Sequence, residues 1–189
     1  IRDRDSKRYI HELLALISPQ AIELRGCYLD TQRRFIAEAL RLSGAIQPRP
    51  SPNPGVGCVI VPNSRDAIAM GQTQKVGGPH AEIMAIRDAA SRGLETAGAT
   101  AYVTLEPCSH HGRTGPCCDA LIQAGIKKVV ATNLDPNPLV AGQGFAKLKA
   151  AGVEVDVLDP TDPLAIASRE LNIGFFSRMI RKTPWVRMK

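Results

Sequence analysis

Four residues in two separate stretches of the chain have the types and spacing of a hydrolytic metal site. His80 and Glu82 lie two positions apart, and Cys108 and Cys117 each follow a proline. A catalytic zinc ion takes three protein ligands and keeps one position open for water, whereas a structural zinc ion is usually closed by four. His80, Cys108 and Cys117 would supply three ligands, which leaves Glu82 available to move protons.

Three neighbouring residues compete for the same ligand positions. His110 and His111 lie between the two cysteines in the sequence, and Cys118 directly follows Cys117. On a helix, consecutive side chains point about 100° apart, so Cys117 and Cys118 cannot easily share one tetrahedral site. We expect Cys117 to be the ligand, because a proline precedes it as one precedes Cys108.

The expected ligands and the adjacent carboxylate indicate hydrolysis of a C–N bond on a nucleobase-like ring. Zinc lowers the pKa of its water toward about 7, and Glu82 can carry a proton to a ring nitrogen and then to the departing amine. A His-x-Glu stretch followed by Pro-Cys-x-x-Cys is typical of zinc nucleobase deaminases, in which the glutamate is not a ligand. This chain fits that pattern, except that its two cysteines lie much further apart.

Length and composition favour one domain in a reducing compartment. The chain has 189 residues, of which 44% are hydrophobic, enough for one full core but too few for two large domains. Its five cysteines are an odd number that includes two in the expected site, which disfavours a disulfide framework. Because no run of about 18 apolar residues and no secretory leader is apparent, we expect a soluble, cytoplasmic protein without membrane contact.

The charge favours an anionic partner. A formal net charge of +6 suits either a phosphorylated small molecule or a nucleic acid. Aromatic residues make up only 4% of the chain, and no basic block is interleaved with Phe or Tyr as a single-strand stacking platform would require. We therefore expect a small phosphorylated ligand and no nucleic acid.

Helical and strand patterns alternate along the chain. Residues 1–26 have the apolar spacing of an amphipathic helix and are expected to form an N-terminal helical appendage. The remaining pattern predicts strands over 56–61, 67–71, 100–105, 127–133 and 153–158, and helices over 31–44, 80–93, 117–124, 144–151 and 163–180. This alternation predicts an α/β domain in which helices cover a sheet, and ligands of such domains commonly bind at the carboxyl ends of the strands.

The predicted elements would bring the expected site together. His80 and Glu82 fall in the first turn of one helix, Cys108 follows a central strand, and Cys117 begins a second helix. Both helix starts carry the positive end of a helix dipole, which favours a thiolate or carboxylate there. All of these groups are thus expected at one edge of one sheet.

At these residues the chain closely resembles the deaminase domain of the bifunctional riboflavin biosynthesis proteins, the diaminohydroxyphosphoribosylaminopyrimidine deaminases. The resemblance covers about residues 31–189 and is most specific in the long loop between the two cysteines, since cytidine and tRNA adenosine deaminases carry Pro-Cys-x-x-Cys. The matching motifs are Ser51-Pro52-Asn53-Pro54-x-Val56-Gly57, Gly77-Gly78-Pro79-His80-Ala81-Glu82, Pro107-Cys108-Ser109-His110-x-Gly112-Arg113-Thr114-x-Pro116-Cys117 and Asp135-Pro136-Asn137-Pro138.

The resemblance implies a three-layer α/β/α cytidine-deaminase-like fold with a central mixed sheet of about five strands. It implies hydrolysis of the C2 amine of a diaminopyrimidinone that bears a ribosylamino 5-phosphate, with one Zn²⁺ held by His80, Cys108 and Cys117 and with Glu82 as the proton shuttle. The residues implied to contact the pyrimidine, ribose or phosphate are Asn53, His110, Arg113, Asp135 and Asn137. An arginine suits a phosphate, and Asp and Asn suit hydroxyl groups.

Two features depart from the family pattern. Members often carry a histidine seven residues before the zinc histidine, where this chain has Thr73. The family's NADPH-dependent reductase half is absent, so NADPH would be needed only by a longer protein. We expect residues 27–182 to form the deaminase domain and residues 183–189 to begin a linker to such a reductase. By analogy, deaminases of this fold often associate, so a homo-oligomer is also expected.

Two other functions compete with this interpretation. A nucleotide or tRNA nucleobase deaminase of the same superfamily would use the same zinc chemistry, but it would be expected to carry the short cysteine spacing and a basic, aromatic surface. A non-catalytic zinc-binding module is the alternative of a different class. It predicts that replacing Glu82 changes neither stability nor activity.

Overall fold

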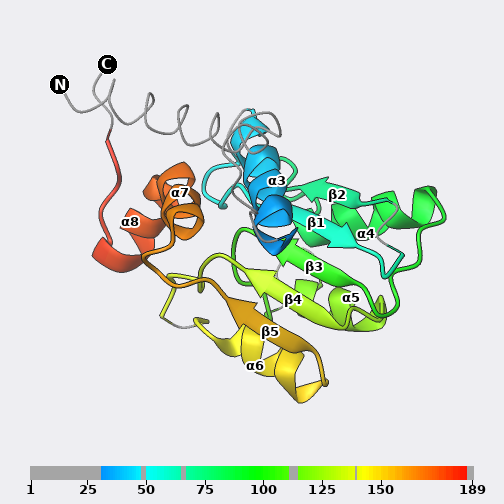
Figure 1. Cartoon of the computed structure of the whole chain (residues 1–189). Helices are drawn as coiled ribbons and strands as arrows, with labels where there is room; N and C mark the ends of the chain where they lie inside the picture. The colour runs from blue at the N-terminus through cyan, green and yellow to red at the C-terminus, as the bar shows by residue number, and fades with distance from the viewer. Residues whose placement is uncertain (1–30, 48–49, 65–66, 111–114, 139, 187–189) are drawn as a thin grey trace, which may run out of the picture.

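A mixed sheet runs through the middle of the fold (Figure 1). The computed structural model describes residues 31–47, 50–64, 67–110, 115–138 and 140–186. Within these ranges five strands form the sheet in the order β2-β1-β3-β4-β5: β1 (Gly57–Val61), β2 (Ala69–Gln72), β3 (Thr100–Val103), β4 (Lys128–Ala131) and β5 (Glu154–Val157). Strand β1 is antiparallel to both β2 and β3, whereas β3, β4 and β5 are parallel.

Helices cover both faces of this sheet (Figure 1). Helices α3 (Thr31–Ala45) and α7 (Pro163–Leu171) pack on one face, where Val59 and Tyr102 are buried. The other face carries α4 (Ala81–Ser91), α5 (Cys117–Gln123) and α6 (Gln143–Ala150). Because successive strand residues point to opposite faces, β1 divides its apolar side chains between the two cores. The expected three-layer α/β/α fold with a mixed sheet is confirmed.

Helix α4 lies unusually close to the edge strand β2. Its buried residues are three alanines and Glu82, and a Cβ atom added at Gly71 of β2 would lie 2.1 Å from the carbonyl oxygen of Ala81 and 2.3 Å from the amide nitrogen of Ala85. A residue larger than glycine would therefore push the helix away from the sheet. This close packing fixes the start of α4, where His80 and Glu82 lie.

The single helix expected over residues 163–180 is wrong, because the structure has two. Helix α7 ends at Leu171 and α8 (Ile173–Arg181) follows, with Asn172 between them at φ −114° and ψ 24°. The buried Asn172 side chain accepts a hydrogen bond from the Gly55 amide at 2.8 Å and donates one to the Gly55 carbonyl at 2.9 Å. This side chain thereby ties the helix break to the loop before β1 and gives α8 a separate direction.

Two other expectations concern the chain as a whole. The helical appendage expected over residues 1–26 lies outside the described residues. Within the described ranges, no helix combines the length and the apolar character that crossing a bilayer requires.

Candidate active site

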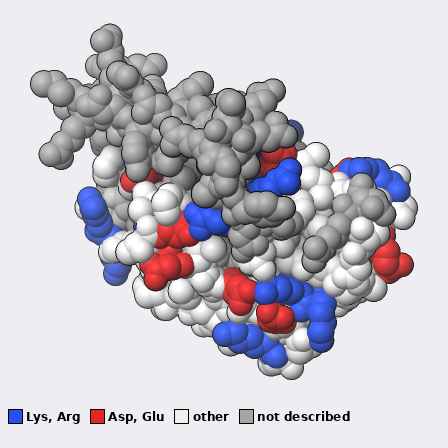
Figure 2. All heavy atoms as spheres, in the orientation of Figure 1, with Lys and Arg blue, Asp and Glu red and all other residues white. Residues whose placement is uncertain are grey.

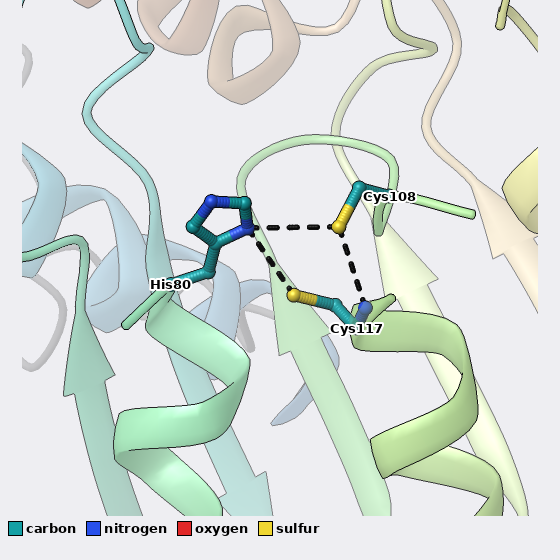
Figure 3. Close-up of side chains that lie close together, drawn as sticks. All are labelled: His80, Cys108 and Cys117. Carbon is teal, nitrogen blue, oxygen red and sulfur yellow. Dashed lines mark hydrogen bonds between the residues drawn. The ribbon is translucent and has the colours of Figure 1, made fainter. Parts of the chain in front are cut away.

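Three side chains from three different segments converge at one edge of the sheet (Figure 3). His80 immediately precedes α4, Cys108 lies in the segment after β3, and Cys117 is the first residue of α5. The Nδ1 atom of His80 lies 3.6 Å from the Cys108 Sγ atom and 3.4 Å from the Cys117 Sγ atom. All three possible ligand atoms lie within 4.8 Å of one another.

The spacing of these atoms fits a tetrahedral zinc ion. Zinc binds sulfur at about 2.3 Å and histidine nitrogen at about 2.0–2.1 Å, so two such ligands in a tetrahedral site lie about 3.6 Å apart. The two measured nitrogen–sulfur distances are close to that value. One nitrogen and two sulfurs also form a donor set that suits zinc, and a fourth position would stay open.

Glu82 places a carboxylate beside these three residues. It lies in the first turn of α4, is only 4% exposed, and lines the same pocket as His80 and Cys108. Burial is the main cause that raises the pKa of Glu82 to about 7, with a further contribution from the charge of Cys108. A carboxyl group with this pKa can both accept and donate protons near neutral pH.

The two cysteines have opposite pKa shifts. A hydrogen bond from the Cys117 side chain is the largest cause that lowers the pKa of Cys108 to about 4, and the same interaction raises the pKa of Cys117. The backbone N–H of Cys117 also donates to the Cys108 Sγ atom at 3.3 Å. This end of the site therefore stabilises a thiolate on Cys108, which is the form that binds metals.

A pocket of about 470 Å³ opens over these groups. This volume is typical of sites for small molecules. Four of the five side chains implied to contact a substrate line it, namely Asn53, His110, Asp135 and Asn137. The fifth, Arg113, lies outside the described residues. The structure thus brings segments from five parts of the chain to one cavity.

Comparison with known proteins identifies the family. Residues 29–133 match the family model described as the cytidine and deoxycytidylate deaminase zinc-binding region. The chain is also 45% identical over 152 residues to the diaminohydroxyphosphoribosylamino-pyrimidine deaminase of Buchnera aphidicola subsp. Schizaphis graminum, covering 80% of this chain and 98% of that protein. The chain belongs to this deaminase family, in its riboflavin-biosynthesis branch. The resemblance inferred from the motifs is therefore confirmed.

Longer relatives contain this deaminase domain as one part. The riboflavin biosynthesis protein RibD of Escherichia coli (strain K12) is 47% identical over 155 residues, which are 82% of this chain but 40% of that protein. The structure of Acinetobacter baumannii RibD superposes with a TM-score of 0.70 at 43% identity and covers 82% of this chain and 41% of that one. The chain therefore spans about two fifths of the length of these relatives.

Cys118, which competes with Cys117 as a possible metal ligand, makes its side-chain contacts outside the cluster of His80, Cys108 and Cys117. Its Sγ atom donates to the Pro107 carbonyl oxygen at 3.2 Å and lies 3.5 Å from the Gly144 carbonyl oxygen. Burial is the main cause that raises the pKa of Cys118 to about 12. Of the two competing histidines, His110 lines the pocket and His111 lies outside the described residues.

Glu106 organises the pocket wall, a role that sequence reasoning missed. Its buried carboxylate accepts backbone hydrogen bonds from Asp135 at 3.0 Å, Gly142 at 2.9 Å, Gly144 at 2.8 Å and Phe145 at 3.4 Å. One side chain thus joins the end of β3 to the loop that carries Asp135 and to the start of α6. The sequence did contain a signal for this role, because Glu106 is a carboxylate directly after a predicted strand and two residues before an expected ligand.

Thr73 has a structural position in this deaminase domain. Its hydroxyl oxygen accepts a hydrogen bond from the Val56 amide at 2.9 Å, and its own amide donates to the Val56 carbonyl at 2.9 Å. Thr73 also lines the pocket, although it is only 5% exposed. The position at which the family resemblance led us to expect a histidine therefore lies at the pocket, where Thr73 joins the end of β2 to the approach to β1.

Proposed function

We propose that this chain is a zinc-dependent hydrolytic deaminase of a diaminopyrimidinone that carries a ribosylamino 5-phosphate. The reaction replaces the C2 amine by a carbonyl oxygen and releases ammonia, with water as the other substrate. The observation that carries the proposal is the His80, Cys108 and Cys117 cluster, with nitrogen–sulfur distances of 3.6 and 3.4 Å and with Glu82 buried beside it. Family membership and the name of the full-length Buchnera relative support this substrate.

His80 through Nδ1 and the two cysteine sulfurs would hold one zinc ion per chain. When bound, zinc acts as a Lewis acid that lowers the pKa of water toward about 7. Two backbone amides help to orient the sulfur ligands, since Cys117 N–H donates to the Cys108 Sγ atom and Cys118 N–H donates to the Cys108 carbonyl oxygen at 3.1 Å. The ligand positions are thereby fixed by the start of α5.

Glu82 moves the protons in this mechanism. It accepts a proton from the attacking water and delivers it to the ring nitrogen next to C2, which makes C2 more electrophilic. It then passes the second water proton to the amine as the C–N bond breaks. Protons balance, because the water supplies one to the ring nitrogen and one to ammonia. Burial of Glu82 keeps bulk water away from this transfer.

The polar residues around the pocket orient the substrate. Asn53, His110, Asp135 and Asn137 line it and offer donors and acceptors to the pyrimidine and ribose hydroxyl groups. Asp135 is itself held in place, because its carboxylate accepts the Asn137 amide at 2.8 Å and its own amide donates to Glu106. A rigid polar wall of this kind favours one orientation of a small ligand.

A small substrate is favoured over a nucleic acid by the surface as well. Figure 2 shows Lys and Arg side chains interspersed with Asp and Glu side chains over the face in view. Ion pairs such as Lys128 with Glu154 and Asp156 neutralise part of the positive charge. On this face, the mixed charges give little of the extended positive potential that binds a phosphate backbone.

We also propose that the deaminase activity resides in residues 27–182. The family match over residues 29–133 and the end of α8 at Arg181 support these limits. Residues 183–189 would begin the connection to the reductase part of longer relatives, and NADPH would serve only such a part. The 98% coverage of the Buchnera deaminase supports a unit of this size.

The deciding experiment is ammonia release from the diaminopyrimidine phosphate, measured beside dCMP, cytidine and a tRNA. We expect rapid release from the first compound and at least about a hundredfold lower kcat/KM for the others, because their rings and substituents leave buried polar groups of the site unpaired. Release from dCMP, cytidine or tRNA but not from the diaminopyrimidine would contradict the proposed substrate. If none of these compounds releases ammonia, the result would favour the alternative of a non-catalytic zinc-binding module.

A further inference from the structure

Helix α8 forms one wall of the deaminase pocket, although it begins 93 residues after His80 in the sequence. Phe175, Arg178 and Met179 of this helix line the same cavity as His80 and Glu82. Their position depends on the helix break, since a straight continuation of α7 would carry them elsewhere. The pocket therefore contains a basic side chain that the deaminase motifs do not include.

Arg178 is held against the loop that carries Asn53. Its Nη2 atom donates to the Pro52 carbonyl oxygen at 2.5 Å, and its Cζ atom lies 5.7 Å from the centroid of the Phe175 ring. Asn172, at the start of the same helix, is bonded to both backbone groups of Gly55. Helix α8 and the 52–55 loop thus form one connected unit at the mouth of the pocket.

The guanidinium group has donors left for a ligand. Arg178 is half-buried, and within the described residues only its Nη2 atom has a hydrogen-bond partner, which leaves Nε and Nη1 for another acceptor. A planar guanidinium held by a carbonyl and an aromatic ring loses little conformational entropy when it binds an oxyanion. This preorganisation favours phosphate, which accepts two parallel N–H hydrogen bonds.

The carboxyl groups of the pocket favour a positive side chain wherever a phosphate binds. Glu82, Glu106 and Asp135 all line it, and a phosphate dianion near these carboxyl groups needs a compensating positive charge. Among the described residues that line the pocket, Arg178 is the one Arg or Lys side chain. Arg178 lies on α8, whereas the three possible metal ligands belong to other segments of the chain.

We propose that Arg178 binds the 5-phosphate of the substrate and makes the enzyme select the phosphorylated compound over its dephosphorylated form. This inference rests on the proposed function and adds a specificity-determining residue to it. A purely positioning role, in which Arg178 only holds the 52–55 loop, would affect both compounds equally.

The test compares two single variants on two substrates. Arg178→Gln removes the charge, and Arg181→Gln is the matched control, because both arginines lie in the last turn of α8 but Arg181 is exposed and does not line the pocket. KM and kcat are measured by ammonia release from the diaminopyrimidine ribosyl phosphate and from the same compound without its phosphate. Inhibition by inorganic phosphate of the reaction with the dephosphorylated compound provides a binding readout.

We expect Arg178→Gln to raise KM for the phosphorylated substrate at least about tenfold, since a charge-assisted hydrogen bond has roughly that effect on affinity. Its kcat/KM for the dephosphorylated compound should stay within about twofold of the original protein, and phosphate inhibition should weaken. Arg181→Gln should change none of these values, and Arg178→Lys should retain part of the selectivity because it retains the charge.

The outcomes separate this inference from the proposed function. Equal losses on both compounds would assign Arg178 to loop positioning and overturn the phosphate role, as would an unchanged KM for the phosphorylated substrate. Failure of the unmodified protein to deaminate either compound would instead overturn the proposed function, and the phosphate role with it.

Discussion

At the scale of single residues, the proposed mechanism assigns metal binding and proton transfer to different side chains. His80, Cys108 and Cys117 present their ligand atoms to one point, whereas Glu82 is buried two residues beyond the histidine. Glutamine has the same shape as glutamate but cannot carry the proton. The carboxylate can therefore be tested without disturbing the three ligands.

Replacing Glu82 by glutamine should abolish turnover and leave the zinc site intact. We expect kcat to fall by about a hundredfold to ten-thousandfold, which is the usual contribution of a positioned general base. Zinc content, measured by atomic emission, and the unfolding midpoint should not fall. A variant that keeps its activity would exclude Glu82 as the proton carrier and would favour a different base in the pocket.

Serine substitution should affect zinc binding and activity at Cys117 but not at the adjacent Cys118. Cys117→Ser replaces a soft ligand by a poor one, so we expect the zinc Kd to rise by more than about a hundredfold and activity to be lost. Cys118→Ser should retain both, because a hydroxyl group can still donate to the Pro107 carbonyl oxygen. Competition with a chromogenic chelator measures both affinities, and the reverse pattern would show that the ligand assignment is wrong.

The residue types of the candidate site could be predicted from the sequence, because metal and acid–base chemistry require particular side chains at particular spacings. Helix geometry indicated that Cys117 and Cys118 could not both be ligands, and the proline before Cys117 favoured Cys117. The contributions of Glu106 and Arg178 could not be recognised in this way. Their partners, the Gly144 amide and the Pro52 carbonyl oxygen, are backbone groups 38 and 126 positions away in the sequence, and backbone groups leave no mark on residue type.

At the scale of elements, short runs rich in apolar and β-branched residues predicted all five strands that the structure describes. The expected helix over residues 163–180 failed because its break depends on a distant contact. Asn172 leaves the helical conformation to bond Gly55, which is 117 positions earlier. Local periodicity cannot report such a tertiary hydrogen bond.

Glu106→Gln tests how the elements around the pocket are joined. The amide nitrogen would face backbone N–H donors that now bond to a carboxylate oxygen, so we expect the free energy of unfolding to fall by about 3 kcal/mol. KM should also rise, because Asp135 depends on this contact. Urea denaturation and steady-state kinetics measure the two effects.

Glu95→Gln is the matched control for this change. Glu95 is exposed and accepts one backbone hydrogen bond, from Ala97 at 3.3 Å, which a glutamine oxygen can also accept. Its effect on unfolding should stay within about 0.5 kcal/mol. Equal effects of the two substitutions would contradict the role of Glu106 as the junction of the pocket wall.

At the scale of the whole molecule, the candidate site brings together two helices that are attached to different strands of the sheet. Helix α4 packs on the edge strand β2, whereas α5 connects the central strands β3 and β4. The three possible ligands come from the start of α4, the end of β3 and the start of α5. A metal bound by all three would therefore stabilise the folded state as well as supply chemistry.

Removing the metal should accordingly lower the thermal stability of the protein. Binding only to the folded state stabilises it by about 2.7 kcal/mol at a free zinc concentration a hundredfold above Kd, which corresponds to roughly 5–10 °C in Tm for a chain of this size. We expect chelator-treated protein to unfold lower by this amount in differential scanning calorimetry, and added Zn²⁺ to restore it. Mg²⁺ should not, because it prefers oxygen ligands.

Cys117→Ser provides the decisive control, since it removes one proposed ligand by exchanging a single sulfur atom for oxygen. Its Tm should be nearly independent of Zn²⁺, whereas Cys118→Ser should respond like the original protein. If zinc raised the Tm of all three proteins equally, the stabilising ion would bind elsewhere. The coupling between α4, β3 and α5 would then come from packing alone, which the alanine face of α4 and the close approach at Gly71 already provide on one side.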